Sequence, residues 1–88
     1  MNSVMSDNPA IVTVDGIIHR VDTVSRQLGL LVQGASMELA VAPDCVIRLS
    51  GETVKLRLLQ PGDRATVAYA IVGRTAFAHS VEVNWLHR

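Results

Sequence analysis

Apolar and polar residues alternate through most of this chain, and no long stretch repeats with the 3.6-residue period of an amphipathic helix. β-branched residues are frequent in the alternating runs, and short clusters of Gly, Pro, Asp and Ser separate them. The pattern therefore predicts β-strands joined by short turns. The predicted strands cover residues 10–22, 28–33, 36–42, 45–59 (as a hairpin), 64–72 and 75–85.

The first predicted strand contains an irregularity near its centre. Val12, Val14 and Ile18 share one face, and Gly16 falls on that same face, where a glycine permits a bend or a close backbone approach. Val21 reaches this face only if the register slips once. We therefore predict a β-bulge at residues 19–20.

The segment from residue 45 to 59 shows the clearest separation of apolar and polar side chains onto two faces of a predicted strand pair. A turn at residues 50–51 would place Ile47 opposite Val54, with Arg48, Lys55 and Arg57 together on the other face. Ser-Gly is a weaker hairpin turn than Asn-Gly. A helical turn over residues 55–59 is therefore left open as an alternative.

Strands at spacings of about ten residues, with turn residues between them, are typical of small barrels. The sequence predicts an all-β fold, a small antiparallel β-barrel of OB-like type with five to seven strands. We expect one barrel domain over residues 10–85, a flexible tail at residues 1–9 and a second tail at residues 86–88.

Three stretches, GIIHRVDTVSRQLGLLV, MELAV and LQPGDRATVAYAIVGRTAFAHSVEV, resemble the CusF-type periplasmic copper/silver-binding domains and related bacterial single-barrel domains of unknown function. The resemblance implies the OB-like scaffold. It also implies a His on the second strand, a Trp before the third and two Met alternating on the third. Of these only Met37 matches, because Leu39 stands at the second Met position and the second strand has no His. The resemblance therefore extends to the scaffold and not to the metal ligands.

Composition limits the possible partners and compartments. The 88 residues contain eight Lys plus Arg and eight Asp plus Glu, so the net charge is zero and gives no general bias towards nucleic acid. No apolar run reaches the roughly 20 residues of a membrane helix, and residues 1–10 lack the pattern of a secretory signal. A single cysteine agrees with a reducing compartment. We therefore expect a cytoplasmic protein with no membrane partner.

Sulfur and nitrogen ligands are too scattered along the chain to indicate a metal or catalytic site. Cys45 and Met37 fit better as packed residues, and three histidines, at positions 19, 79 and 87, lie in separate segments. No sequence motif of a nucleophile with its base is present. We expect no catalytic residues, no cofactor, no metal site and no small-molecule substrate, with metal binding as the third and weakest hypothesis.

The leading hypothesis is a non-catalytic interaction module that forms a homo-oligomer or docks on a protein partner. Small or apolar residues at outward positions form one part of the predicted contact face. The other part is the basic stripe, by which we mean Arg48, Lys55 and Arg57. The alternative is a nucleic-acid-binding domain that uses the basic stripe alone. The candidate face comprises Arg48, Lys55, Arg57, Leu31, Ala68 and Ala70.

Overall fold

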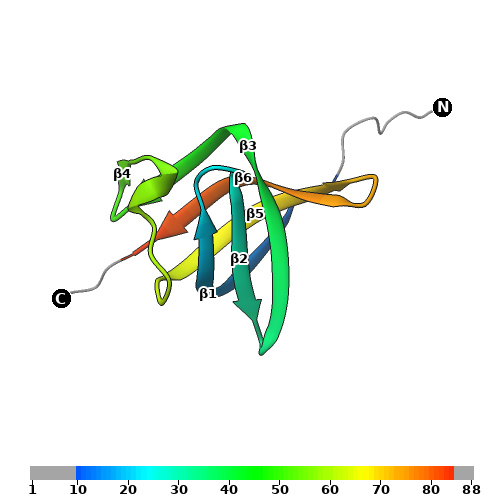
Figure 1. The fold of residues 1–88 in the computed structure, drawn as a ribbon, viewed down its shortest axis with the longest axis horizontal. Coiled ribbons are helices and arrows are strands. Elements are labelled where there is room, and N and C mark those ends of the chain that lie inside the picture. The colour runs from blue at the N-terminus through cyan, green and yellow to red at the C-terminus, as the bar shows by residue number, and fades with distance from the viewer. Residues whose placement is uncertain (1–9, 85–88) are drawn as a thin grey trace.

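The computed structural model describes residues 10–84, in which the chain forms six strands and one 3-10 turn (Figure 1). The predicted tails, residues 1–9 and 86–88, lie outside this range, as do Trp85 and His87. The elements are β1 (Val12–Asp22), β2 (Gln27–Val32), β3 (Ala35–Leu49), β4 (Glu52–Thr53), η1 (Leu56–Leu58), β5 (Arg64–Val72) and β6 (Thr75–Val83).

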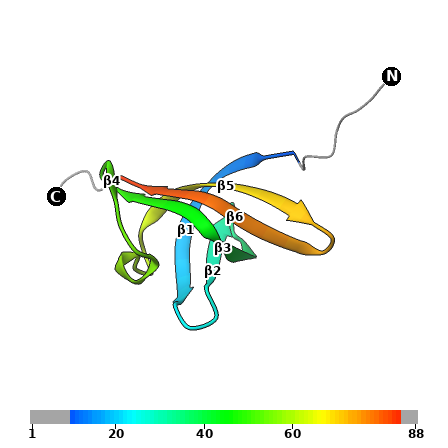
Figure 2. The same cartoon turned by 90° about the horizontal axis from the view of Figure 1, so that it is seen from above.

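The strands form a sheet in the order β2-β1-β5-β6-β3-β4, and a further pairing of β2 with β3 closes it into a barrel. All pairings are antiparallel except β3 with β6, which is parallel. The prediction of a small, mostly antiparallel barrel is confirmed. Figure 2 shows β5 and β6 in an upper layer, with β2 and the second half of β1 below them.

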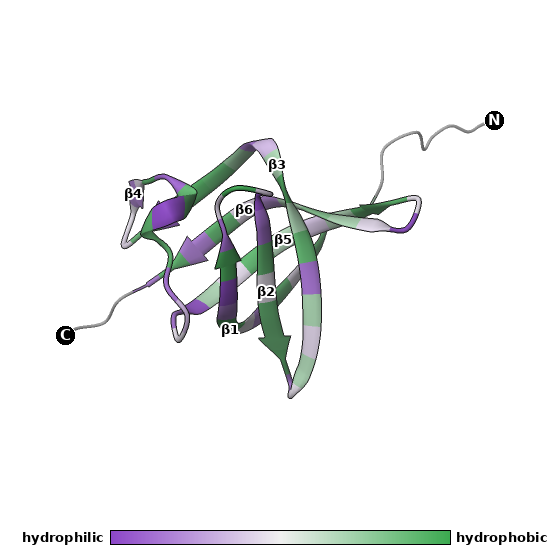
Figure 3. Ribbon diagram, in the orientation of Figure 1, coloured by the Kyte–Doolittle hydropathy of each residue, from purple (hydrophilic) through white to green (hydrophobic). Residues whose placement is uncertain are grey.

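The core is made of aliphatic side chains from every long strand and from the segment around η1. Alternation places these side chains inside, as the changing hydropathy along β2 and β3 in Figure 3 illustrates. The largest fully buried side chains are those of Ile18, Leu28, Leu30, Leu39, Val67, Val81 and Val83.

The predicted bulge in the first strand is present. Ile18 pairs with Leu30 and Arg20 pairs with Gly29, so His19 is the extra residue. The predicted close approach at Gly16 is also present, because a Cβ atom there would lie 2.5 Å from the backbone oxygen of Leu31. At this corner β1 exchanges its partner β5 for β2.

The predicted chain break at Pro43 is wrong, because β3 runs continuously from Ala35 to Leu49. Its ladder with β6 is interrupted between Val41 and Val46, so proline occupies a stretch where its missing N–H costs no hydrogen bond to β6. Arg26 contacts the beginning of this interrupted stretch. Its guanidinium group donates to the carbonyl oxygens of Val41 at 3.4 Å and Ala42 at 3.2 Å.

The predicted long hairpin after residue 45 is only partly correct. Val54 N–H donates to the carbonyl of Ile47 at 2.8 Å, as expected, but β4 has two residues and the chain then forms η1. The helical turn is therefore the alternative that occurs. Because the chain turns there, Leu58 leaves the core face and is 46% exposed.

A second bulge, in β6, was not predicted. Ala68 pairs with Ser80 and Tyr69 pairs with Ala78, which leaves His79 as the extra residue. The side chain of His79 is exposed. Beyond this bulge the tip of the β5–β6 hairpin projects from the barrel (Figure 1).

Candidate interaction surface

Four strands, β1, β5, β6 and β3, present a continuous outward side that we call the outer face. Inward neighbours of its residues, such as Val67, Val81 and Ile47, are buried in the core. The strand register arranges the outward side chains in two rows across the sheet. One row is Asp15, Thr66, Glu82 and Arg48, and the other is Thr13, Ala68, Ser80 and Val46.

The charged row is anchored at one end by a hydrogen bond. The hydroxyl of Thr66 donates to Oδ1 of Asp15 at 2.6 Å, which fixes the carboxylate on the surface of β1. At the other end Arg48 and Glu82 are register partners on β3 and β6. Neither of these two side chains has an ion-pair partner within 4.0 Å among residues 10–84. The row therefore keeps charge that a partner could contact.

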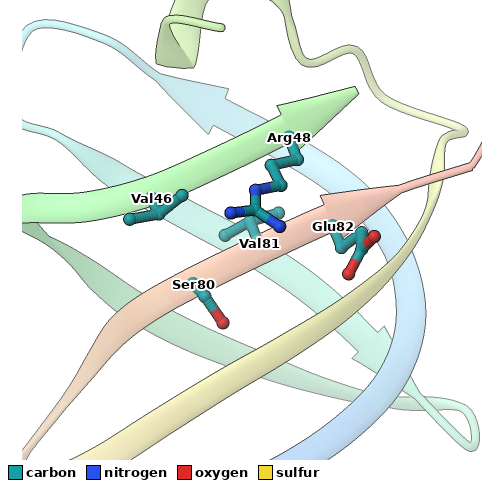
Figure 4. A pocket seen from close by; sticks show the side chains of 5 residues that line it. All are labelled: Val46, Arg48, Ser80, Val81 and Glu82. Carbon is teal, nitrogen blue, oxygen red and sulfur yellow. The ribbon is translucent and has the colours of Figure 1, made fainter. Parts of the chain in front are cut away.

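Two hollows flank Glu82 on this face. Figure 4 shows the first, of about 290 Å³, where Arg48 lies over the surface between β3 and β6. The second hollow, of about 350 Å³, includes Asp15, Thr66 and Arg64, whose guanidinium has no ion-pair partner among residues 10–84. Both are open depressions and not enclosed cavities, and an open surface fits contact with a protein better than the enclosure of a small molecule.

The structure separates the six predicted face residues. Arg48 and Ala68 lie on the outer face, and Leu31 is on the outward side of β2, where it is 38% exposed. Ala70 does not contribute an exposed surface, because it is fully buried. Its register partner is Phe77, and a methyl group beside a large aromatic residue is easily covered.

The predicted basic stripe does not form one strand face. Arg48 is on β3, Lys55 lies in the link after β4, and Arg57 lies in η1. All three are exposed, but the hairpin that was expected to align them ends at Thr53. The acid Glu82 also stands directly beside Arg48.

A polar network that the sequence did not reveal covers the outward side of β1, β2 and β3. Arg20 forms ion pairs with Glu38 and, at 3.8 Å, with Asp22. His19 Nε2 lies 3.2 Å from the hydroxyl of Ser36, and its ring passes over Gly29, where any Cβ atom would lie 2.7 Å from it. Only the unusual glycine in the middle of a strand could have indicated this arrangement.

The chemistry of the sulfur atoms argues for packing. Met37 packs against the core and faces Leu30 across the β2–β3 ladder. Burial raises the pKa of the Cys45 thiol to about 11, so at neutral pH it is a protonated thiol and a weak metal ligand. Within residues 10–84 no three His, Cys, Asp or Glu side chains converge on a point where a metal ion could bind. No helix in the same range is long and apolar enough to span a membrane.

Comparison with known proteins identifies the scaffold. No family model matches the chain, and no curated protein matches it. Among solved structures it is similar to CusF-Ag(I), residues 10–88, from Escherichia coli, with a TM-score of 0.75 and 12% identity over 92% of this chain and 100% of that one. Apo-CusF, residues 6–88, from the same organism gives a TM-score of 0.73 at 12% identity over 97% and 100%. The barrel is thus the CusF fold.

This comparison corrects the expected location. CusF is a periplasmic protein, so its fold points away from the predicted cytoplasmic compartment. The prediction depended on the residue pattern of positions 1–10, the lack of a long apolar run and the single cysteine. A free cysteine that cannot form an intrachain disulfide is compatible with either compartment, so this residue was weak evidence.

Proposed function

We propose that this protein is a non-catalytic binding module that acts by associating with a second copy of itself. The observation that supports this is the outer face, whose hydrogen-bonded and unpaired charges are interspersed with small side chains. A sheet face with small outward side chains can pack against another sheet.

Burial of exposed apolar surface would supply a driving force for self-association. A small domain rarely leaves many large apolar side chains open to water unless they meet a partner. Val46 on the outer face is 42% exposed, and Ile71 and Val72 at the hairpin tip are 58% and 54% exposed. Within residues 10–84, six other large apolar residues are more than one third exposed, namely Ile11, Val12, Ile17, Val24, Leu31 and Leu58.

A non-catalytic role is supported by the state of the potential nucleophiles. Cys45 is half-buried, and its raised pKa keeps the thiol protonated at neutral pH. Ser36 contacts His19, but the contact lies on an exposed sheet surface and no hydrogen bond to a carboxylate orients the imidazole among the described residues. Nucleophilic catalysis needs that third group to align the base.

Sedimentation velocity from low to high micromolar concentration tests the proposal. We expect the mass to rise from 9.5 kDa towards about twice that value as concentration increases. A mass that stays at 9.5 kDa at several hundred micromolar would exclude self-association as the function.

The likeness to silver-bound CusF supports a second candidate function, the binding of copper or silver ions in the periplasm. Met37 is the one residue that matches the ligand types expected from the resemblance, and it lies on β3 facing Leu30. Titration with Ag(I) in a Cys45→Ala background tests this candidate. Stoichiometric uptake supports it, and no uptake at micromolar concentration removes it.

A further inference from the structure

We propose that two copies pack outer face to outer face about a two-fold axis that runs parallel to the strands, between β5 and β6. This inference rests on the proposed self-association and specifies its surface. The two sheets would then stack as in a β-sandwich, about 10 Å apart.

The charged row selects this axis. Rotation by 180° between β5 and β6 reverses the strand order, so β1 lies over β3 of the second copy. Asp15 then faces Arg48 of the second copy, and the symmetry produces this contact twice. An axis along the row itself would instead place Asp15 on Asp15 and Arg48 on Arg48, and such like-charge contacts are unfavourable.

Asp15 and Arg48 cannot satisfy each other within one chain. β5 and β6 stand between their strands, so three strand spacings, about 14 Å in total, separate them. Asp15 accepts one hydrogen bond from Thr66, and its carboxylate has further acceptor capacity. Arg48 has no ion-pair partner among residues 10–84. The two charges are therefore available to a second copy.

The neighbouring row allows the sheets to approach. About the same axis Ala68 faces Ser80 of the second copy, and Thr13 faces Val46. All four side chains are small, so the close approach of the two backbones meets little steric resistance. The rotation also places the hollow beside Arg48 over the hollow that contains Asp15, so each arginine has room to reach its carboxylate.

Charge reversal with complementation in mixtures tests the arrangement. Asp15→Arg and Arg48→Asp should each weaken the homodimer at least about tenfold, because each places like charges opposite one another twice. An equimolar mixture of the two variants should recover the dimer, since a heterodimer has an Arg–Asp pair at both positions. Sedimentation velocity measures both effects. Arg57→Asp in η1 is the matched control and should dimerise as the natural chain does.

A cross-linking experiment covers the case in which a charge variant fails to fold. Thr13→Cys and Val46→Cys, each in a Cys45→Ala background, should form a disulfide-linked heterodimer when mixed under mild oxidation. If the natural chain dimerises but the charge mixture does not recover association and this disulfide does not form, the interface lies elsewhere and the inference is wrong. A natural chain that remains monomeric overturns the proposed function as well.

Discussion

Gly16 and Gly29 are both buried within strands, but an added methyl group would have different neighbours at the two sites. At Gly16 the nearest atom is the backbone oxygen of Leu31, at 2.5 Å, which cannot move without shifting β2. At Gly29 it is the imidazole of His19, at 2.7 Å, which can rotate away. Gly16 is therefore a requirement of the barrel corner, whereas Gly29 accommodates one surface side chain.

Alanine substitutions should separate these two roles. Gly16→Ala should lower the free energy of unfolding by about 1–3 kcal/mol, the usual cost of overpacking. Gly29→Ala should cost less than about 1 kcal/mol, because only the contact of His19 with Ser36 is lost. Urea unfolding followed by circular dichroism measures both. Equal losses in the two variants would contradict the assigned roles.

Cys45 gives a pH-dependent prediction at the same scale. Because burial raises its pKa to about 11, the reactive thiolate is scarce at pH 7 to 9. Its alkylation rate by iodoacetamide should keep rising beyond pH 9, whereas an unstructured cysteine peptide should level off above its pKa of about 8.5. The thiol of the unfolded chain ionises first, so this residue makes the fold less stable as pH rises towards 11. A rate plateau near pH 9 would show that the thiol is not shielded.

Among the strands, β3 depends on a contact with one arginine, Arg26, which lies outside it. This arginine lies at a positive φ of 55° and reaches two carbonyl oxygens where the ladder between β3 and β6 is interrupted. Arg26→Ala leaves both acceptors without this partner and should cost about 1–3 kcal/mol of stability. Arg57→Ala, an exposed arginine in η1, is the control and should change stability little. Equal stability of the two variants would mean that water replaces the guanidinium group.

The sequence predicted those elements whose apolar pattern had a single consistent solution. The bulge at His19 followed from the need to bring Val21 back to the core face, and the bounds of β5 followed from an alternating pattern, although the alternation breaks at Ala70. The bulge at His79 could not be predicted in this way, because apolar residues occupy both faces of β6 around it. The continuity of β3 was missed because proline in a strand is tolerated only where the partner strand is absent, and this depends on tertiary structure.

The candidate site on the outer face was likewise predictable only in part, because its arrangement depends on how the strands pair. Arg48 and Ala68 were singled out from strand parity, which placed both correctly, but the same parity also placed the buried Ala70 outward. Asp15, Thr66 and Glu82 were not singled out, because their alignment with Arg48 depends on three strand registers. A sequence pattern indicates the side of a strand only where the strand is regular, and it does not show which residues stand beside it in the sheet.

At the scale of the whole molecule, a shared barrel is separable from the residues that would bind a metal. The chain has the CusF fold, yet Leu30 and Leu39 occupy inward positions beside Met37 where the resemblance expects a His on the second strand and a second Met. If the scaffold is intact and only ligands are missing, Leu30→His with Leu39→Met should give a chain that takes up about one equivalent of Ag(I), since imidazole and thioether groups suit soft metal ions.

Isothermal titration in the Cys45→Ala background measures this gain against the otherwise unchanged chain, which should bind far more weakly. Leu31→His with Leu39→Met is the matched control, because it has the same ligand types but places the imidazole on the outward side of β2, away from Met37 and position 39. Uptake by the unchanged chain equal to that of the Leu30→His double variant would show that residues outside this row bind the ion. Equal uptake by the control would show that the position on β2 does not matter.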